Sequence, residues 1–211
     1  VLQPIGVSDP IVCPGKIGAR MSIVDPIAMP RLNDRLLILP LLLAVLPWLP
    51  VLGAPLMVDD RVLYYEARKW LGLDWMAPWH LPLGGSGTWR PLGVYAFWID
   101  AGLPASLQHA TNLLLHAGLV AVGHGWLRGR VGREAACAGA CLLAVYPAHA
   151  ANLGWIAGRA DLLMGLLAAS ALWAWDREHV LRCALFAAAA VLVKETAVAL
   201  VPMFLVLRLD R

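Results

Sequence analysis

Charged residues are scarce in this chain. Only 15% of its 211 residues are Asp, Glu, Lys or Arg, whereas 60% are hydrophobic and the mean hydropathy is +0.69. A soluble domain of this length must turn about half of its residues towards water, and one core cannot hide so much apolar surface. The composition therefore argues against an ordinary soluble domain and predicts an all-α integral membrane protein, a polytopic helical bundle.

Several chemical signatures are also missing. The sequence contains no GxxxxGK[ST] phosphate loop, no HExxH, no CxxC and no GxSxG. The net charge is only +3, and no run of Lys or Arg is typical of a nucleic-acid surface. Of four cysteines, Cys137 and Cys141 lie one helical turn apart in an apolar run, which favours a packing role. We expect no nucleic-acid partner and no definite cofactor, and a divalent metal is left open.

The two ends of the chain differ from its middle. Residues 1–30 are rich in Pro and Gly and lack an initiator Met, which is typical of a disordered tail or a mis-called gene start. Met21 or Met29 would then be the true start. At the other end, Arg211 directly follows an apolar run. We therefore expect 31–211 to be the N-terminal part of a longer membrane domain.

Apolar runs predict about six spans, since a spanning helix needs roughly 20 apolar residues. The last three runs are short, and 180–208 could be one helix. Two helices are preferred because the adjacent Lys194 and Glu195 cost less at a membrane surface than at mid-depth. The candidate spans are 36–58, 105–127, 134–153, 161–176, 180–194 and 196–208.

Basic residues predict the orientation. If every apolar run crosses the membrane, most of the basic residues in short loops fall on one side, and the positive-inside rule assigns that side to the cytoplasm. The first run could be a signal peptide, but it exceeds the usual 7–15 apolar residues, so a retained span is favoured. A multi-pass protein of a bacterial inner membrane is expected. The basic residues are Arg31, Arg35, Arg128, Arg130, Arg133, Arg177, Arg182, Arg208 and Arg211.

The first outer loop, 59–104, is unusual. It begins with two adjacent acids, carries five of the ten tryptophans (70, 75, 79, 89 and 98) and has a Gly-Gly-Ser-Gly hinge at 84–87. Its patterns predict short amphipathic helices at 60–71 and 91–101. Tryptophan prefers the headgroup level, so we expect this loop to lie along the outer surface.

Polar residues at the outer ends of the runs are the main functional signal, because each costs energy near a membrane. Adjacent carboxylates can divide their work: one takes a proton from an acceptor hydroxyl, while the other binds a metal or positions the acceptor. Cations at this depth can hold a lipid-linked phosphate. The candidates are Asp59, Asp60, Arg90, His109, Asn112, His149, Arg159, Asp161, Lys194 and Glu195.

Simpler interpretations stay open. The two acids could be a solvated loop start, and Arg159 could form a local ion pair with Asp161 at a helix N-terminus. The Lys-Glu pair could bind each other or neighbouring helices. His116 shares a helix face with His109 but lies about 10 Å further along, too far for one metal ion. Interhelical hydrogen bonding is the simpler role for His116.

Six sequence pieces, in order over about 140 residues, resemble the GT-C class of membrane glycosyltransferases. The chain is most similar to the transmembrane part of TMTC proteins and their bacterial relatives, which are akin to protein O-mannosyltransferases. The family often has His-Pro-x-His where this chain has Tyr-Pro-Ala-His, and family members have more spans and tetratricopeptide repeats. The pieces are Asp59-Asp60, Trp-Arg-Pro-Leu (89–92), His109-x-x-Asn112-x-x-x-His116, Tyr-Pro-Ala-His (146–149), Gly-Arg-Ala-Asp (158–161) and Lys194-Glu195.

The resemblance implies a hexosyltransferase with a polyprenyl- or dolichyl-phosphate sugar donor and an acceptor hydroxyl on a protein or glycan. It implies inversion at the sugar and an active site on the outer face. The acidic pair would supply the base, with Asp59 slightly favoured, and Arg90, Arg159 and Lys194 would hold the phosphate. Whether this fragment is active alone stays open. The competing predictions are a transporter or lipid-handling protein and a structural subunit; polar residues thin out below His116, which argues against transport.

Overall fold

The computed structural model describes residues 34–57, 59–62, 75–80 and 87–209, with side chains to 207. The fold is all-α, as the composition predicts. The expected tail at 1–30, Trp70, most of the first amphipathic helix and Gly84 to Ser86 lie outside the described residues. The long helices are α1 (Arg35–Val45), α5 (Ala105–Val131), α6 (Arg133–Val145), α8 (Arg159–Asp176), α9 (Val180–Val193) and α10 (Leu200–Leu209).

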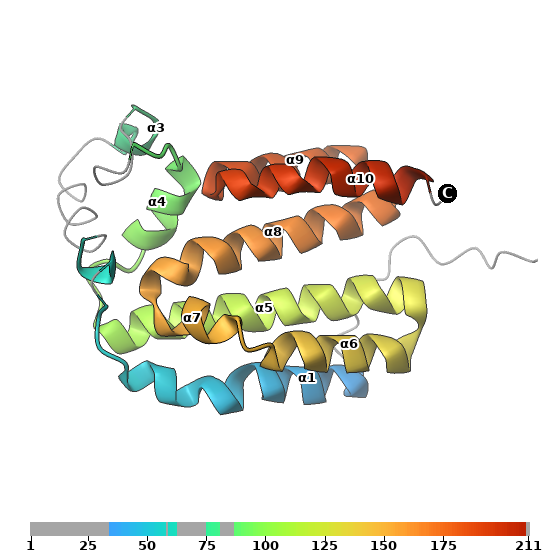
Figure 1. Cartoon of the computed structure of the whole chain (residues 1–211), viewed down its shortest axis with the longest axis horizontal. Coiled ribbons are helices and arrows are strands. Elements are labelled where there is room, and N and C mark those ends of the chain that lie inside the picture. The colour runs from blue at the N-terminus through green and yellow to red at the C-terminus, as the bar shows by residue number, and fades with distance from the viewer. Residues whose placement is uncertain (1–33, 58, 63–74, 81–86, 210–211) are drawn as a thin grey trace, which may run out of the picture.

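Shorter helices gather at one end of the bundle (Figure 1). Residues 59–62 form a helical turn at that end, and the predicted second loop helix is confirmed as α4, although it stops at Trp98 instead of 101. Three of the short elements are 3-10 helices, which extend or connect the longer ones. The short elements are η1 (Leu46–Gly53), α3 (Ala77–His80), α4 (Pro91–Trp98), α7 (His149–Gly154), η2 (Ile156–Gly158) and η3 (Glu195–Ala199).

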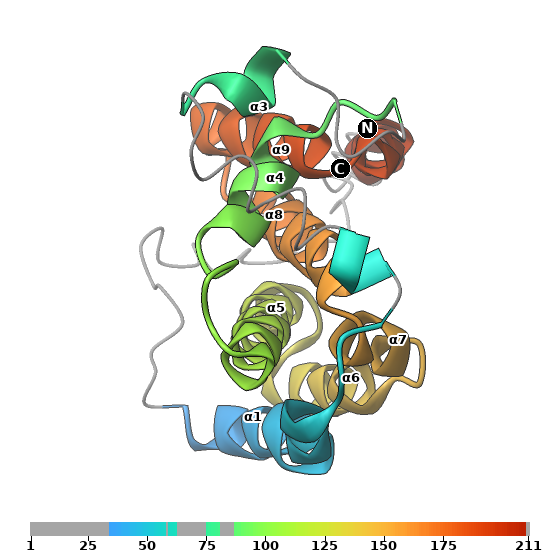
Figure 2. The ribbon, with the colours of Figure 1, turned by 90° about the vertical axis from the view of Figure 1, so that its left-hand side faces the viewer.

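The long helices run side by side in alternating directions, and α5 lies at the centre (Figures 1 and 2). It packs against α1, α6 and α8, and α8 packs against α9. Small residues permit this close approach. On α6, three fully buried alanines recur every fourth residue, so they share one helix face. They are Ala136, Ala140 and Ala144.

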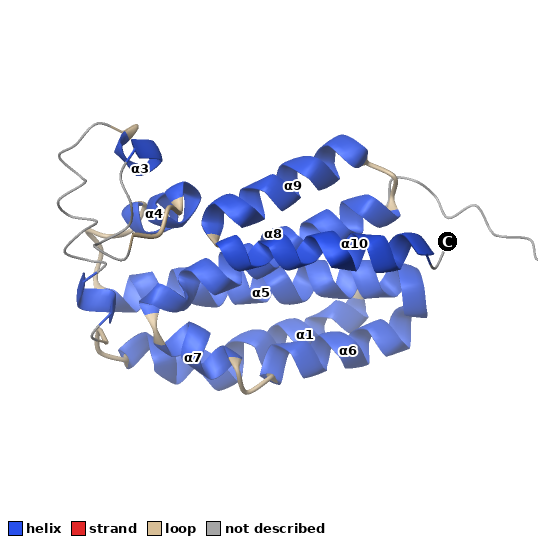
Figure 3. Cartoon of the chain, turned by 45° about the horizontal axis from the view of Figure 1, so that its top comes forward, coloured by secondary structure: helices blue, strands red, loops and turns tan. Residues whose placement is uncertain are grey.

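Proline and glycine set several helix boundaries. Pro147 follows the C-cap Tyr146 of α6, and a proline disfavours helical backbone in the residue before it. The run expected as one span at 134–153 is therefore divided between α6 and α7. Gly132 joins α5 to α6 with φ of 85°, a value that favours glycine. Figure 3 shows the break between α6 and α7 as a tan loop between blue helices.

The expected six spans are not supported. Within the described residues, two helices are long and apolar enough to cross a membrane, Arg35–Gly53 with 19 residues and Ile156–Asp176 with 21. α5 has 27 residues but does not qualify, and it carries several buried polar side chains. α9 has 14 residues and rises only about 21 Å, less than a hydrocarbon layer of about 30 Å.

The opposite end of the bundle is held by arginines. Asp34 caps α1 by accepting a hydrogen bond from the Leu36 amide, and it pairs with Arg133 at 2.8 Å and Arg128 at 2.9 Å. The hydrogen bond from Arg133 is the main reason that the pKa of Asp34 lies below its usual value. This carboxylate therefore ties the first helix to the α5–α6 connection.

Candidate active site

The two acids that open the outer loop have different environments. Asp60 is only 2% exposed, and its carboxylate accepts the backbone N–H of Met57 at 3.0 Å and of Ala157 at 2.7 Å. Asp59 is exposed. Because both residues belong to one helical turn, the buried carboxylate fixes the backbone from which the exposed one projects. This arrangement suits a division between anchoring and chemistry.

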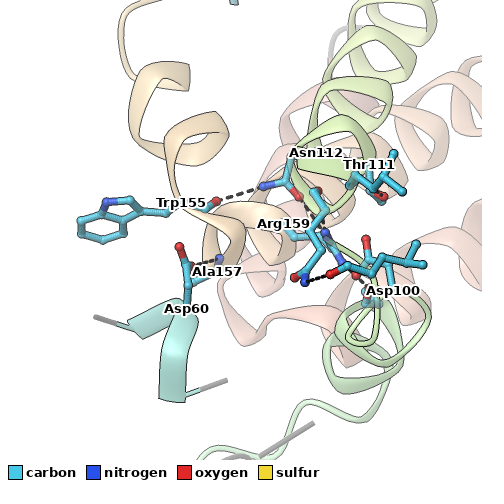
Figure 4. A network of polar contacts seen from close by, with 11 residues as sticks. Asp60, Asp100, Thr111, Asn112, Trp155, Ala157 and Arg159 are labelled. Atoms are coloured by element: carbon cyan, nitrogen blue, oxygen red, sulfur yellow. Dashed lines mark hydrogen bonds and ion pairs between the residues drawn. The ribbon is translucent and has the colours of Figure 1, made fainter. Parts of the chain in front are cut away.

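Arg159 lies at the centre of a buried polar network (Figure 4). Its side chain is fully buried, and its donors reach Asn112 Oδ1 at 2.9 Å and two backbone carbonyls at 2.8 Å, those of Ala96 and Gln108. It also forms an ion pair with Asp100, which is 3% exposed. Four of the five N–H donors of a guanidinium are thus engaged with protein groups. The pairing also neutralises a charge that would be costly to bury alone.

Asn112 extends this network to the connection between α7 and α8. Its amide nitrogen donates to the carbonyl oxygens of Asn152 at 3.2 Å and Trp155 at 2.9 Å. A guanidinium can only donate, so the arginine requires the amide oxygen on its own side and turns the NH₂ towards the two carbonyls. The arginine therefore determines which way this amide points.

The connection itself is unusually tight. A Cβ built on Gly158 would lie 2.5 Å from both the Cα and the carbonyl oxygen of Asn152. Those are backbone atoms, so no side-chain movement could relieve the contact. Glycine is required here, and the closeness brings the Ala157 N–H to the carboxylate of Asp60.

Four charged side chains form a second, more accessible cluster. Arg90 donates from Nε to Glu195 Oε2 at 2.8 Å and from Nη2 to Oε1, a two-pronged ion pair. Lys194 pairs with Asp161. The hydrogen bond from Arg90 is the largest reason that the pKa of Glu195 falls to about 2, and Glu195 in turn raises the pKa of Arg90. We name these four residues the charge quartet.

The predicted histidines lie inside the bundle. His109 contacts the Leu153 carbonyl through Nδ1 at 3.2 Å, and His116 contacts the Ala144 carbonyl through Nε2 at 3.1 Å. The interhelical hydrogen bond considered for His116 is therefore present. The rings of His116 and His149 lie 4.5 Å apart between centroids. Among the described residues, no group of three His, Cys, Asp or Glu side chains could hold a metal ion.

The structure brings the predicted residues to one end of the bundle but changes their partners. Arg159 pairs with Asp100 and Asp161 pairs with Lys194, so the local pair between Arg159 and Asp161 does not form. Sequence reasoning missed Asp100. A signal existed, since Asp100 is the only Asp, Glu, Lys or Arg between Arg90 and Arg128.

Comparison with known proteins finds a distant relative. No family model and no solved structure matches the chain. Over 178 residues this chain is 31% identical to the Drosophila melanogaster protein named Protein O-mannosyl-transferase Tmtc1. The matched region makes up 74% of this chain and 20% of the fly protein. The chain thus spans about a fifth of the length of that curated relative. The likeness suggests a glycosyltransferase-related protein.

Proposed function

We propose that this chain is part of a membrane glycosyltransferase that moves a hexosyl group from a polyprenyl- or dolichyl-phosphate carrier to a hydroxyl of a protein or glycan. The observation that carries the proposal is the contrast between the exposed Asp59 and the buried, backbone-bound Asp60. The likeness to a protein O-mannosyl-transferase supports it. Mannose is the sugar we would try first.

The proposed step is a single displacement at the anomeric carbon. The acceptor hydroxyl gives its proton to the Asp59 carboxylate as its oxygen forms a bond to that carbon. The bond between the anomeric carbon and the phosphate oxygen breaks, and its electron pair leaves with the lipid phosphate. The configuration at the sugar inverts. Asp60 takes no proton in this scheme, because both of its oxygens are held by backbone amides.

Arg90 and Lys194 are the residues that we assign to the phosphate. Their side chains are 21% and 22% exposed, and their present partners are the carboxylates of Glu195 and Asp161. A phosphate can replace a carboxylate on such cations because both are anionic acceptors. We leave Arg159 out of phosphate binding, since it is fully buried and four of its donors are engaged.

The surface composition supports a place in a membrane. Only 17% of the apolar stretch in Arg35–Gly53 is buried in the structure. Large apolar side chains on this helix and on α9 and α10 are exposed, and a water-soluble protein rarely exposes so many of them on its helices. We propose that lipid covers these helix faces and that the charge quartet lies on the outer side of the membrane, away from the cytoplasm. Exposed examples are Ile38, Leu39, Leu42, Leu185, Phe186, Val201 and Leu205.

The proposal is tested with membrane vesicles that contain the full-length protein and radiolabelled dolichyl-phosphate mannose. Replacement of the base by Asn should lower transfer by about 10²- to 10⁴-fold, the usual contribution of a general base. If a folded Asp59→Asn protein transferred sugar at the wild-type rate, the assignment of Asp59 as the base would be wrong.

A transporter or lipid-handling protein remains the second candidate because of one observation. His124 lies two turns beyond His116 on α5, is 1% exposed, and has an Nε2 without a partner among the described residues. The buried polar row on α5 therefore continues further than the sequence indicated. Movement of a lipid-linked sugar across vesicles that survives Asp59→Asn but fails in His124→Ala would favour this candidate.

A further inference from the structure

We propose that Arg159 is a positioning residue that holds both ends of the outer loop, the carboxylate pair at its start and the Arg90-bearing helix at its end. The inference rests on the proposed function and deepens it, because it assigns Arg159 to the geometry of the site instead of to the donor phosphate.

One branch of contacts leads from Arg159 to the start of the loop. Its Nε–H donates to Asn112 Oδ1 and so orients this amide, whose NH₂ donates to the carbonyl oxygens of Asn152 and Trp155. The connection held in this way presents the Ala157 N–H to Asp60. Because Asp59 is the adjacent residue in the same helical turn, that hydrogen bond also fixes the position of its backbone. Figure 4 shows this chain of contacts from Arg159 to Asp60.

The other branch leads to the end of the loop. Arg159 binds the carbonyl of Ala96 in the last turn of α4 and the carboxylate of Asp100 just after it. At the first turn of α4, Gly93 packs so closely on α9 that a Cβ there would lie 3.0 Å from the Val193 carbonyl oxygen. Because α4 is a short rigid helix held at both ends, Arg90 at its N-cap is fixed as well.

Only arginine can serve both branches. The partners lie in several directions around the side chain, and the planar guanidinium presents five donors in a fixed fork. A lysine has three donors on a single atom and cannot reach four separated acceptors. With lysine at 159, at least one buried acceptor of the network would lack a partner, so the loop ends should loosen even though the positive charge is kept.

The experiment uses the full-length protein with three variants, Arg159→Lys, Asn112→Asp and the control Arg130→Lys. Asn112→Asp keeps an oxygen for Arg159 but removes the NH₂ that holds the carbonyls. Arg130→Lys changes an arginine that pairs with Asp176 at the opposite end. The first readouts are kcat and KM with dolichyl-phosphate mannose. The second is hydrogen exchange at the backbone amides of Met57 and Ala157, which donate hydrogen bonds to the Asp60 carboxylate.

For Arg159→Lys and Asn112→Asp we expect kcat to fall about 100-fold, the effect of misplacing a catalytic group by about 1 Å. The KM for the donor should stay within about threefold, since the packing of Gly93 on α9 does not involve Arg159 and still holds the first turn of α4 next to Arg90. The two amides should exchange at least about tenfold faster. Arg130→Lys should change none of these values.

The outcomes are distinguishable. A large rise in KM with unchanged exchange at the two amides would mean that Arg159 binds the donor, which overturns the inference. Unchanged kcat and exchange in both variants would also overturn it. If the wild-type protein transfers no sugar, the proposed function fails, whereas the exchange measurements still decide whether Arg159 fixes the loop.

Discussion

Replacement of Gly158 by alanine tests the tight connection on which the site depends. The added Cβ would lie 2.5 Å from Asn152 Cα and carbonyl oxygen and 2.8 Å from its carbonyl carbon. Favourable contacts between carbon atoms lie at about 3.5–4.0 Å, so the backbone would have to open by about 1 Å. Such overpacking costs about 1–3 kcal/mol, and we expect the upper part of that range because all three contacts are with backbone.

The measurement is thermal unfolding of the purified protein in detergent, followed by tryptophan fluorescence. For a domain of about 200 residues, a loss of this size lowers Tm by roughly 5–10 °C. Gly154→Ala is the matched control, because a Cβ there meets nothing within 4 Å and φ is not positive. If Gly158→Ala melted within about 1 °C of Gly154→Ala, the tight packing described for this connection would be refuted.

Three further predictions concern charges at the two ends of the bundle. The pKa of Glu195 is about 2, below its ordinary value of 4.5, so its pair with Arg90 stabilises the folded state fully above pH 4.5, and this stabilisation is lost as the pH falls towards 2. Glu195→Gln should therefore flatten the acid unfolding curve in this window. The change should be modest because the pair is partly exposed. Arg90→Gln and Lys194→Gln should each raise the KM for the lipid-linked sugar by about 10-fold or more, since a charge-assisted hydrogen bond contributes about 1.5–3 kcal/mol; unchanged KM values would contradict the phosphate assignment. Asp34→Ala should cost about 1–2 kcal/mol in chemical unfolding, because it removes the α1 cap and the pairs with two arginines; Glu134→Ala on the exposed α6 surface serves as its control.

Much of the helical layout could be predicted from the sequence because its causes are local. The start of α5 at Ala105 follows a proline, and the end of α6 at Val145 precedes one, so both boundaries are properties of the nearby chain. The gathering of acids and cations at one end also followed, since it needs only the order of apolar and polar segments.

The partners of the charged residues could not be predicted in the same way. Arg159 lies two residues from Asp161 yet pairs with Asp100, 59 residues away, because α4 folds back across α8 and brings that carboxylate into the core. The predicted number of membrane spans was not supported, for a related reason. A hydropathy profile cannot distinguish α9, 14 residues long and packed against α8, from a helix that crosses a bilayer alone.

Asp59→Asn and Asp60→Asn, compared in one preparation for both Tm and the rate of sugar transfer, distinguish the proposed base from the proposed anchor. We predict that Asp59→Asn keeps the wild-type Tm and loses about 10²- to 10⁴-fold in transfer rate. Asp60→Asn should lower Tm, because a buried acceptor of two backbone amides loses its charge. A folded Asp59→Asn protein that transfers sugar at the wild-type rate would contradict the proposal that Asp59 is the base.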